Sequence, residues 1–177
     1  MVCPRLIAGF RSRSPDEKWV LGYATIGARA NEGDLYLAST TIPGTPTTLS
    51  TDLAAGLFDS DGFTADSSHA IYYTDIAAGV GNFFAVATSG GTPVPLSTNV
   101  WLHYAATGSK VVFNDNYDQA TDTADIRVVD TAQATPATVL VSVAGSTFYI
   151  AGSKDKVVYS WNYLAGSMAG LWVTPIP

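Results

Sequence analysis

Apolar residues in this chain occur in runs of three to six, bounded by Gly, Pro, Asp, Asn, Ser and Thr. Runs of this length with such boundaries are typical of β-strands joined by turns. No segment shows the longer apolar period of an amphipathic helix. The pattern therefore predicts an all-β protein.

One unit recurs four times: a short polar turn, a basic or histidine residue, and an apolar strand. The anchor residues are Lys18, His69, Lys110 and Lys156, which are 51, 41 and 46 residues apart. A second apolar strand and then a Thr-Pro pair follow in each copy, the last pair being Thr174–Pro175. A repeat of about 40 to 50 residues is typical of propellers and solenoids.

The strand after each anchor is apolar at consecutive positions, as in Val111-Val112-Phe113. Successive side chains of a strand point to opposite faces, so such a strand is covered on both sides, as in a propeller blade. We therefore expect a partial β-propeller of four-stranded antiparallel blades, three complete and one lacking its outer strand. The expected blades are 4–55, 56–99, 100–145 and 146–177. A β-sandwich built from the same strands is the alternative.

Each unit is expected to open with a strand of its own. The third of these opening strands is predicted at Trp101–Tyr104. Trp19 and Trp172 fall in strand positions that predict core packing.

Composition limits the classes of function. The 177-residue chain carries a net charge of −6, and an acidic chain repels phosphate backbones, so we expect no nucleic acid partner. No stretch approaches the roughly 20 apolar residues of a membrane span, and no signal peptide is visible. Cys3 is the only cysteine, which excludes an intrachain disulfide and a cysteine-based zinc site.

Three segments resemble the WD40-like repeats of the TolB-like β-propeller family: the turn 14–18, the strand 33–37 and the turn 89–96. The resemblance covers essentially the whole chain. It implies a propeller fold and a periplasmic or extracellular location. A closed propeller of this family would have about six or more blades. This chain has fewer blades, so it associates with a protein partner, with missing blades of the same protein or with a second copy, or else it stays open.

A catalytic constellation is missing from the sequence. There is no Gly-x-Ser-x-Gly motif, and the only histidines are His69, expected as a solvated turn residue, and His103, expected to pack within a strand. We therefore expect a non-catalytic binding or scaffold module of a larger propeller protein. Two alternatives stay open: the accessory propeller domain of a prolyl-oligopeptidase-type serine peptidase, and an acidic metal-binding propeller enzyme.

The segment Asn114–Asp125 has oxygen-bearing side chains at a spacing that suits calcium. The candidate ligands are Asn114, Asn116, Asp118 and Asp122. Gln119 stands where an EF-hand loop needs glycine, and no helices flank the segment, so a solvated hairpin without metal is the alternative. No other cofactor is expected.

Aromatic residues in expected loops are candidates for partner binding. They are Tyr117, Trp161 and Tyr163. Exposed aromatic side chains are enriched at protein interfaces. A purely structural role is the alternative for all three.

Overall fold

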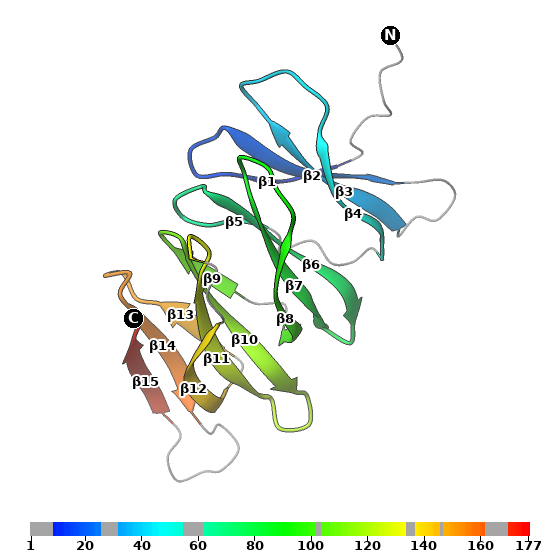
Figure 1. Ribbon diagram of the computed structural model, residues 1–177. Coiled ribbons are helices and arrows are strands. Elements are labelled where there is room, and N and C mark those ends of the chain that lie inside the picture. The colour runs from blue at the N-terminus through cyan, green and yellow to red at the C-terminus, as the bar shows by residue number, and fades with distance from the viewer. Residues whose placement is uncertain are drawn as a thin grey trace.

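The computed structural model describes residues 9–25, 32–54, 62–101, 104–133, 137–145, 147–161 and 170–177. These residues form fifteen β-strands in four antiparallel sheets and contain no helix. The sheets follow one another in chain order and pack face to face (Figure 1). Four separate sheets stacked in this way are propeller blades, so the predicted all-β partial propeller is confirmed and the sandwich alternative is wrong.

Three sheets have four strands, and the last has three. The first sheet holds β1 (Gly9–Arg13), β2 (Trp19–Thr25), β3 (Glu32–Ser39) and β4 (Thr47–Ala54). The second holds β5 (Gly62–Phe63), β6 (His69–Ala77), β7 (Val80–Ala87) and β8 (Val94–Trp101). The third holds β9 (Tyr104–Thr107), β10 (Lys110–Asp118), β11 (Thr123–Asp130) and β12 (Thr138–Gly145). The fourth holds β13 (Phe148–Ile150), β14 (Lys156–Trp161) and β15 (Gly170–Pro175).

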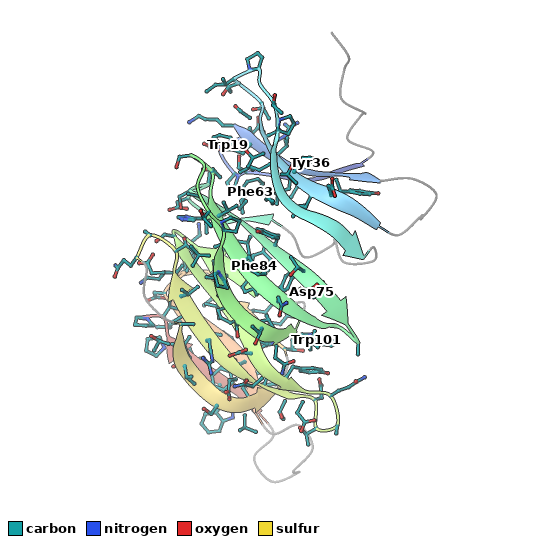
Figure 2. All side chains as sticks on the ribbon, turned by 45° about the vertical axis from the view of Figure 1, so that its right-hand side comes forward. Trp19, Tyr36, Phe63, Asp75, Phe84 and Trp101 are labelled. Atoms are coloured by element: carbon teal, nitrogen blue, oxygen red, sulfur yellow. The ribbon has the colours of Figure 1, made fainter. Side chains whose placement is uncertain are left out.

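Side-chain alternation along the inner strands explains the continuous apolar runs. In β6, Ala70 and Tyr72 pack against the first sheet, whereas Ile71 and Tyr73 pack against the third. We call the face toward the preceding sheet the trailing face and the face toward the next sheet the leading face. Each pair of neighbouring sheets encloses one core between a leading and a trailing face, which gives three cores among the described residues. Trp19 and Phe84 lie at the margin of the first core (Figure 2).

The turn before the inner strand is closed by the same hydrogen bond in the first, second and fourth sheets. The backbone N–H of Ser14 donates to the carbonyl of Trp19 at 2.9 Å, and that of Thr64 donates to His69 at 2.9 Å. Trp19 is therefore the structural counterpart of His69. The predicted alignment of Lys18 with His69 was wrong by one residue, because the hydrogen bond that closes the turn sets the register and the charge does not.

Two further sequence predictions were placed wrongly. Trp101 ends β8, where it pairs with Val80, and the third sheet opens only at Tyr104. Pro175 pairs with Lys156 inside the sheet, so the last Thr-Pro pair lies in β15 and not in a turn. Residue type alone does not show which strand a position belongs to or where that strand ends, and pairing with the neighbouring strand decides both.

Candidate functional site

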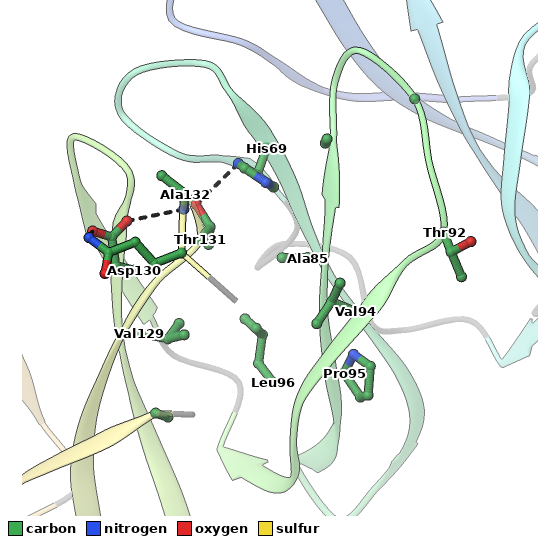
Figure 3. A pocket seen from close by; sticks show the side chains of 14 residues that line it. His69, Ala85, Thr92, Val94, Pro95, Leu96, Val129, Asp130, Thr131 and Ala132 are labelled. Carbon is green, nitrogen blue, oxygen red and sulfur yellow. Dashed lines mark hydrogen bonds between the residues drawn. The ribbon is translucent and has the colours of Figure 1, made fainter. Parts of the chain in front are cut away.

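A cavity of about 460 Å³ opens between the second and third sheets. Figure 3 shows it beside the start of β6 and the end of β11. Its apolar walls include Ala85, Val94, Leu96, Val129 and Ala137. Polar groups also line it, among them His69, Thr92, Asp130, Thr131 and Gln133. We call this cavity the seam pocket.

A small residue in the second sheet helps to explain why the seam pocket exists. Ala85 pairs with Ile71 in the same register in which Leu37 pairs with Leu21 in the first sheet, and Val128 with Val112 in the third. Ala85 therefore occupies a repeat position that elsewhere carries a branched side chain. The missing methyl groups leave volume unfilled between the sheets. This exchange for alanine is the sequence signal that could have indicated the pocket.

His69 is held by two hydroxyl groups. Its Nδ1 lies 2.9 Å from Ser68 Oγ and 3.1 Å from Thr131 Oγ1. The Ser68 hydroxyl donates its proton to Asp66 at 2.7 Å, and the Thr131 hydroxyl donates to the carbonyl of Ser109 at 2.7 Å. Both oxygens therefore accept from the ring, so Nδ1 carries the proton of the neutral imidazole. Nε2 is the hydrogen-bond acceptor of that tautomer.

Burial sets the charge state of this ring. Partial burial of His69 lowers its pKa, and the carboxylates of Asp66 and Asp130 oppose that shift only in part. The carboxylate of Asp130 is engaged elsewhere: it accepts from Ser109 Oγ at 2.6 Å and from the Ala132 backbone N–H at 3.1 Å. The seam pocket thus presents a neutral imidazole at neutral pH.

The threonine after the third strand of a sheet recurs in three blades. Thr40, Thr88 and Thr131 each donate their hydroxyl to a backbone carbonyl of the preceding turn, at 2.7, 3.0 and 2.7 Å. Sequence analysis missed this repeat because threonine is frequent between these strands. Of the three, only Thr131 also contacts the imidazole of His69, so it joins the turn of its own blade to the neighbouring blade.

The predicted metal ligands lie at the opposite end of the third sheet. Asn114 is fully buried within β10, whereas Asn116 donates to Asp125 at 2.9 Å. Asp118 accepts from the Ala120 N–H and the Thr121 hydroxyl, both at 2.9 Å. Within the described ranges, no three His, Cys, Asp or Glu side chains are placed to share a metal ion. The calcium site stays a prediction.

The predicted aromatic residues are only partly placed. Tyr117 lies against Trp101 with ring centroids 4.2 Å apart and planes at 31°, and its hydroxyl donates to Asp122 at 3.1 Å. The contact with Trp101 crosses from the third sheet to the second, so Tyr117 has a packing role here. The side chain of Trp161 and the whole of Tyr163 lie outside the described residues, and so do His103 and Cys3.

The expectation that His69 is a solvated turn residue was wrong. It is the first residue of β6, half-buried and hydrogen-bonded to the next blade. Trp172, expected in the core, is 45% exposed on β15. The sequence pattern locates both strands, but the covering of these two side chains depends on which sheet packs against each strand.

The fold is that of known propeller proteins. TolB from Acinetobacter baumannii superposes with a TM-score of 0.52 at 16% identity, and the putative TolB from Agrobacterium tumefaciens with 0.52 at 17%. A prolyl endopeptidase superposes with a TM-score of 0.59 at 12% identity. At such identities the likeness shows the fold alone. It confirms that the chain has the fold of TolB-like propellers, as the resemblance predicted.

These structures are longer than the part that matches. The superpositions include 94%, 95% and 94% of this chain but only 40%, 61% and 27% of the respective structures. The chain thus spans less than two thirds of each. No protein-family model matches the sequence, and no curated protein matches it significantly.

Proposed function

We propose that this chain is a non-catalytic binding module built on the TolB-like propeller fold, and that the seam pocket is its binding site. The observation that supports the proposal is the pocket itself, which two blades form together. Its volume of about 460 Å³ lies within the range of about 300 to 1,000 Å³ usual for ligand pockets. The imidazole of His69 lines the pocket, and the hydrogen bonds of its Nδ1 to two hydroxyl groups fix the orientation of the ring.

The walls define the chemistry of the ligand. Apolar side chains such as Val94, Leu96 and Val129 favour an apolar group through its removal from water. The Nε2 acceptor of His69 favours a ligand that also carries a hydrogen-bond donor. An apolar amino-acid side chain beside its own amide N–H has both features, so the proposed ligand is a segment of a partner protein.

The test uses N-acetyl-leucinamide and N-acetyl-phenylalaninamide as probes, titrated into isotope-labelled protein and followed by NMR. We expect shifts concentrated at residues that line the pocket, such as Ala87, Leu96 and Thr131. Ala85→Leu fills the pocket with the residue type found at the same position of the first sheet, and it should abolish the shifts. Ala65→Leu, on an exposed turn, is the matched control and should leave them unchanged. Equal shifts in both variants, or none in the unchanged protein, would contradict the proposal.

A second function is favoured by one comparison. The superposition on a prolyl endopeptidase supports an accessory propeller domain of a prolyl-oligopeptidase-type serine peptidase. A hydrolase domain with a nucleophile elbow, encoded in the same reading frame, would favour this function over the binding module. In both cases the chain by itself should hydrolyse no peptide substrate above background.

The fold likeness also supports a location. The described residues include no helix long and apolar enough to cross a membrane. On the likeness to TolB structures we propose a periplasmic or extracellular location. Cell fractionation with an antibody against the chain tests it, and recovery in the cytoplasmic fraction alone would contradict it.

A further inference from the structure

The leading face of the last sheet carries apolar residues where every other sheet buries them. Val173 is 58% exposed and Leu171 is 79% exposed. Val173 pairs with Val158, and Tyr149 pairs with Val158 from the other side, so an apolar row crosses all three strands of this face. Tyr149 is also exposed.

Strand register identifies the counterparts of these residues. Val173 occupies the repeat position of Leu37, Ala85 and Val128. Leu171 occupies that of Leu35, Phe83 and Ile126. All six counterparts are at most 5% exposed, because the next sheet covers them. The last sheet therefore has the residue pattern of a blade whose leading face is covered by another blade.

The chain itself carries a face of the matching kind. On the trailing face of the first sheet, Val20, Tyr36 and Ala38 are half-buried, and no other sheet formed by the described residues precedes this one. Their counterparts in the second sheet are Ala70, Phe84 and Val86, which pack in the first core. Every core among the described residues joins a leading face to a trailing face. The last sheet exposes a leading face, and the first sheet exposes a trailing face.

A ladder of hydrogen bonds accompanies each sheet contact. The residue directly before the positive-φ position of one turn donates to the residue at the positive-φ position in the turn of the next blade. The three pairs are Asp16 N–H to Ser67 Oγ at 3.0 Å, Asp66 N–H to the Gly108 carbonyl at 3.2 Å, and Thr107 Oγ1 to the Lys154 carbonyl at 3.0 Å. The donor position at the last blade is Ser153, and the acceptor position at the first blade is Glu17. One further step of the ladder would join them.

We infer that a second copy of this chain covers the last sheet with the trailing face of its own first sheet, in the geometry of the internal contacts. The interface is head to tail, and such interfaces close into rings when the rotation per subunit allows. Two copies bring eight sheets together, within the usual range of about four to eight blades. The assembly is therefore a closed dimer with two identical interfaces, and it does not depend on the seam pocket.

Sedimentation equilibrium at tens of micromolar is the first test, and we expect the mass of a dimer. Val173→Asp places a carboxylate in the proposed interface and should weaken association at least about tenfold, since a buried unpaired charge is costly. Val143→Asp is the matched control: Val143 is 62% exposed on β12 and should tolerate the change. Circular dichroism should show both variants folded, because both positions are exposed in the single chain.

Cysteine cross-linking tests the geometry in a Cys3→Ser background. A mixture of one protein with Ser153→Cys and another with Glu17→Cys should form a disulfide-linked pair. The internal counterpart, Thr107→Cys with Lys154→Cys in one chain, should form an intrachain disulfide under the same conditions. A monomer at tens of micromolar would overturn the inference. So would a dimer that is indifferent to Val173→Asp and forms no cross-link.

Discussion

Nδ1 of His69 lies 3.1 Å from the hydroxyl oxygen of Thr131, and this hydrogen bond joins the second sheet to the third. The same hydroxyl donates to the carbonyl of Ser109. One threonine thus connects a turn of its own blade to the first residue of β6 in the neighbouring blade. Both residues line the seam pocket, so the bond also sets the shape of the pocket wall.

A double-mutant cycle should reveal this contact. We expect His69→Ala and Thr131→Val to show a coupling energy of about 1 kcal/mol in chemical denaturation, since a hydrogen bond contributes about that much. Thr40 is the control, because its hydroxyl donates to the carbonyl of Glu17 in the turn of its own blade. The cycle of His69→Ala with Thr40→Val should show no coupling. Equal coupling in both cycles would contradict a specific bond.

The lowered pKa of His69 predicts how stability depends on pH. Its pKa in the unfolded chain is about 6.5. Because the folded value is lower, the unfolded chain binds more protons below about pH 6.5, so stability falls as the pH decreases through that value and levels off below the folded pKa. His69→Asn keeps a donor near Nδ1 but does not titrate. Melting curves between about pH 5 and 7 should show a smaller pH dependence for the variant, and equal slopes would contradict the prediction.

The blade architecture could be predicted from the sequence because it depends on local patterns. Consecutive apolar positions such as Val111 and Val112 indicate strands covered on both faces, and the two residues do belong to different cores. The register of the repeat could not be predicted from charge. Trp19 and Lys156 occupy the same structural position, since both accept the hydrogen bond that closes the turn.

The seam pocket could not be predicted from the sequence. Its lining residues come from two blades, and separately Ala85, Leu96 and Val129 are ordinary strand residues. Only the register between blades shows that Ala85 replaces a larger side chain. The contact of His69 with Thr131, 62 residues away, likewise depends on how two sheets pack.

Non-glycine residues with positive φ are targets for stabilisation. Glu17 and Lys154 have φ of 62° and 63°, at the turn position that carries Gly108 in the third blade. Replacing either with glycine relieves backbone strain and should stabilise the fold by about 0.5 to 1 kcal/mol, or roughly 1 to 4 °C in melting temperature. Ser67, with φ of 65°, is the contrast, because its hydroxyl accepts a bond from Asp16.

Ser67→Gly should therefore gain less than the other two substitutions, or lose stability. Differential scanning calorimetry of the three single variants measures the order. If Ser67→Gly were the most stabilising of the three, the hydrogen bond from Asp16 would have no part in joining the first two blades.

Gly79 lies so close to the ring of Trp101 that a larger residue does not fit at this position. It has φ of 84° in the two-residue turn between β6 and β7, and a Cβ there would lie 2.5 Å from Cζ3 of Trp101. Gly79→Ala should destabilise by about 2 to 4 kcal/mol, from backbone strain and from the displaced ring. Gly108→Ala is the control: it has positive φ but no atom within 4 Å, so about 1 kcal/mol is expected. Only Gly79→Ala should alter the near-ultraviolet circular dichroism of the Trp101–Tyr117 pair, and an unchanged spectrum would contradict the contact.

The candidate calcium ligands lie in and beside the hairpin between β10 and β11, so calcium binding is tested there. The carboxylate of Asp118 accepts hydrogen bonds from the Thr121 hydroxyl and the Ala120 N–H, and both bonds lower its pKa. If calcium binds, it should raise the melting temperature relative to chelator, by an amount equivalent to about 2.7 kcal/mol at a hundredfold excess over the dissociation constant. Asp118→Ala should remove that increment, whereas Asp75→Ala, at the same end of the second sheet, should not. If the hairpin is simply solvated, Asp118→Ala should lower the melting temperature equally with calcium and with chelator. That equality would exclude the acidic metal-binding enzyme that depends on this site.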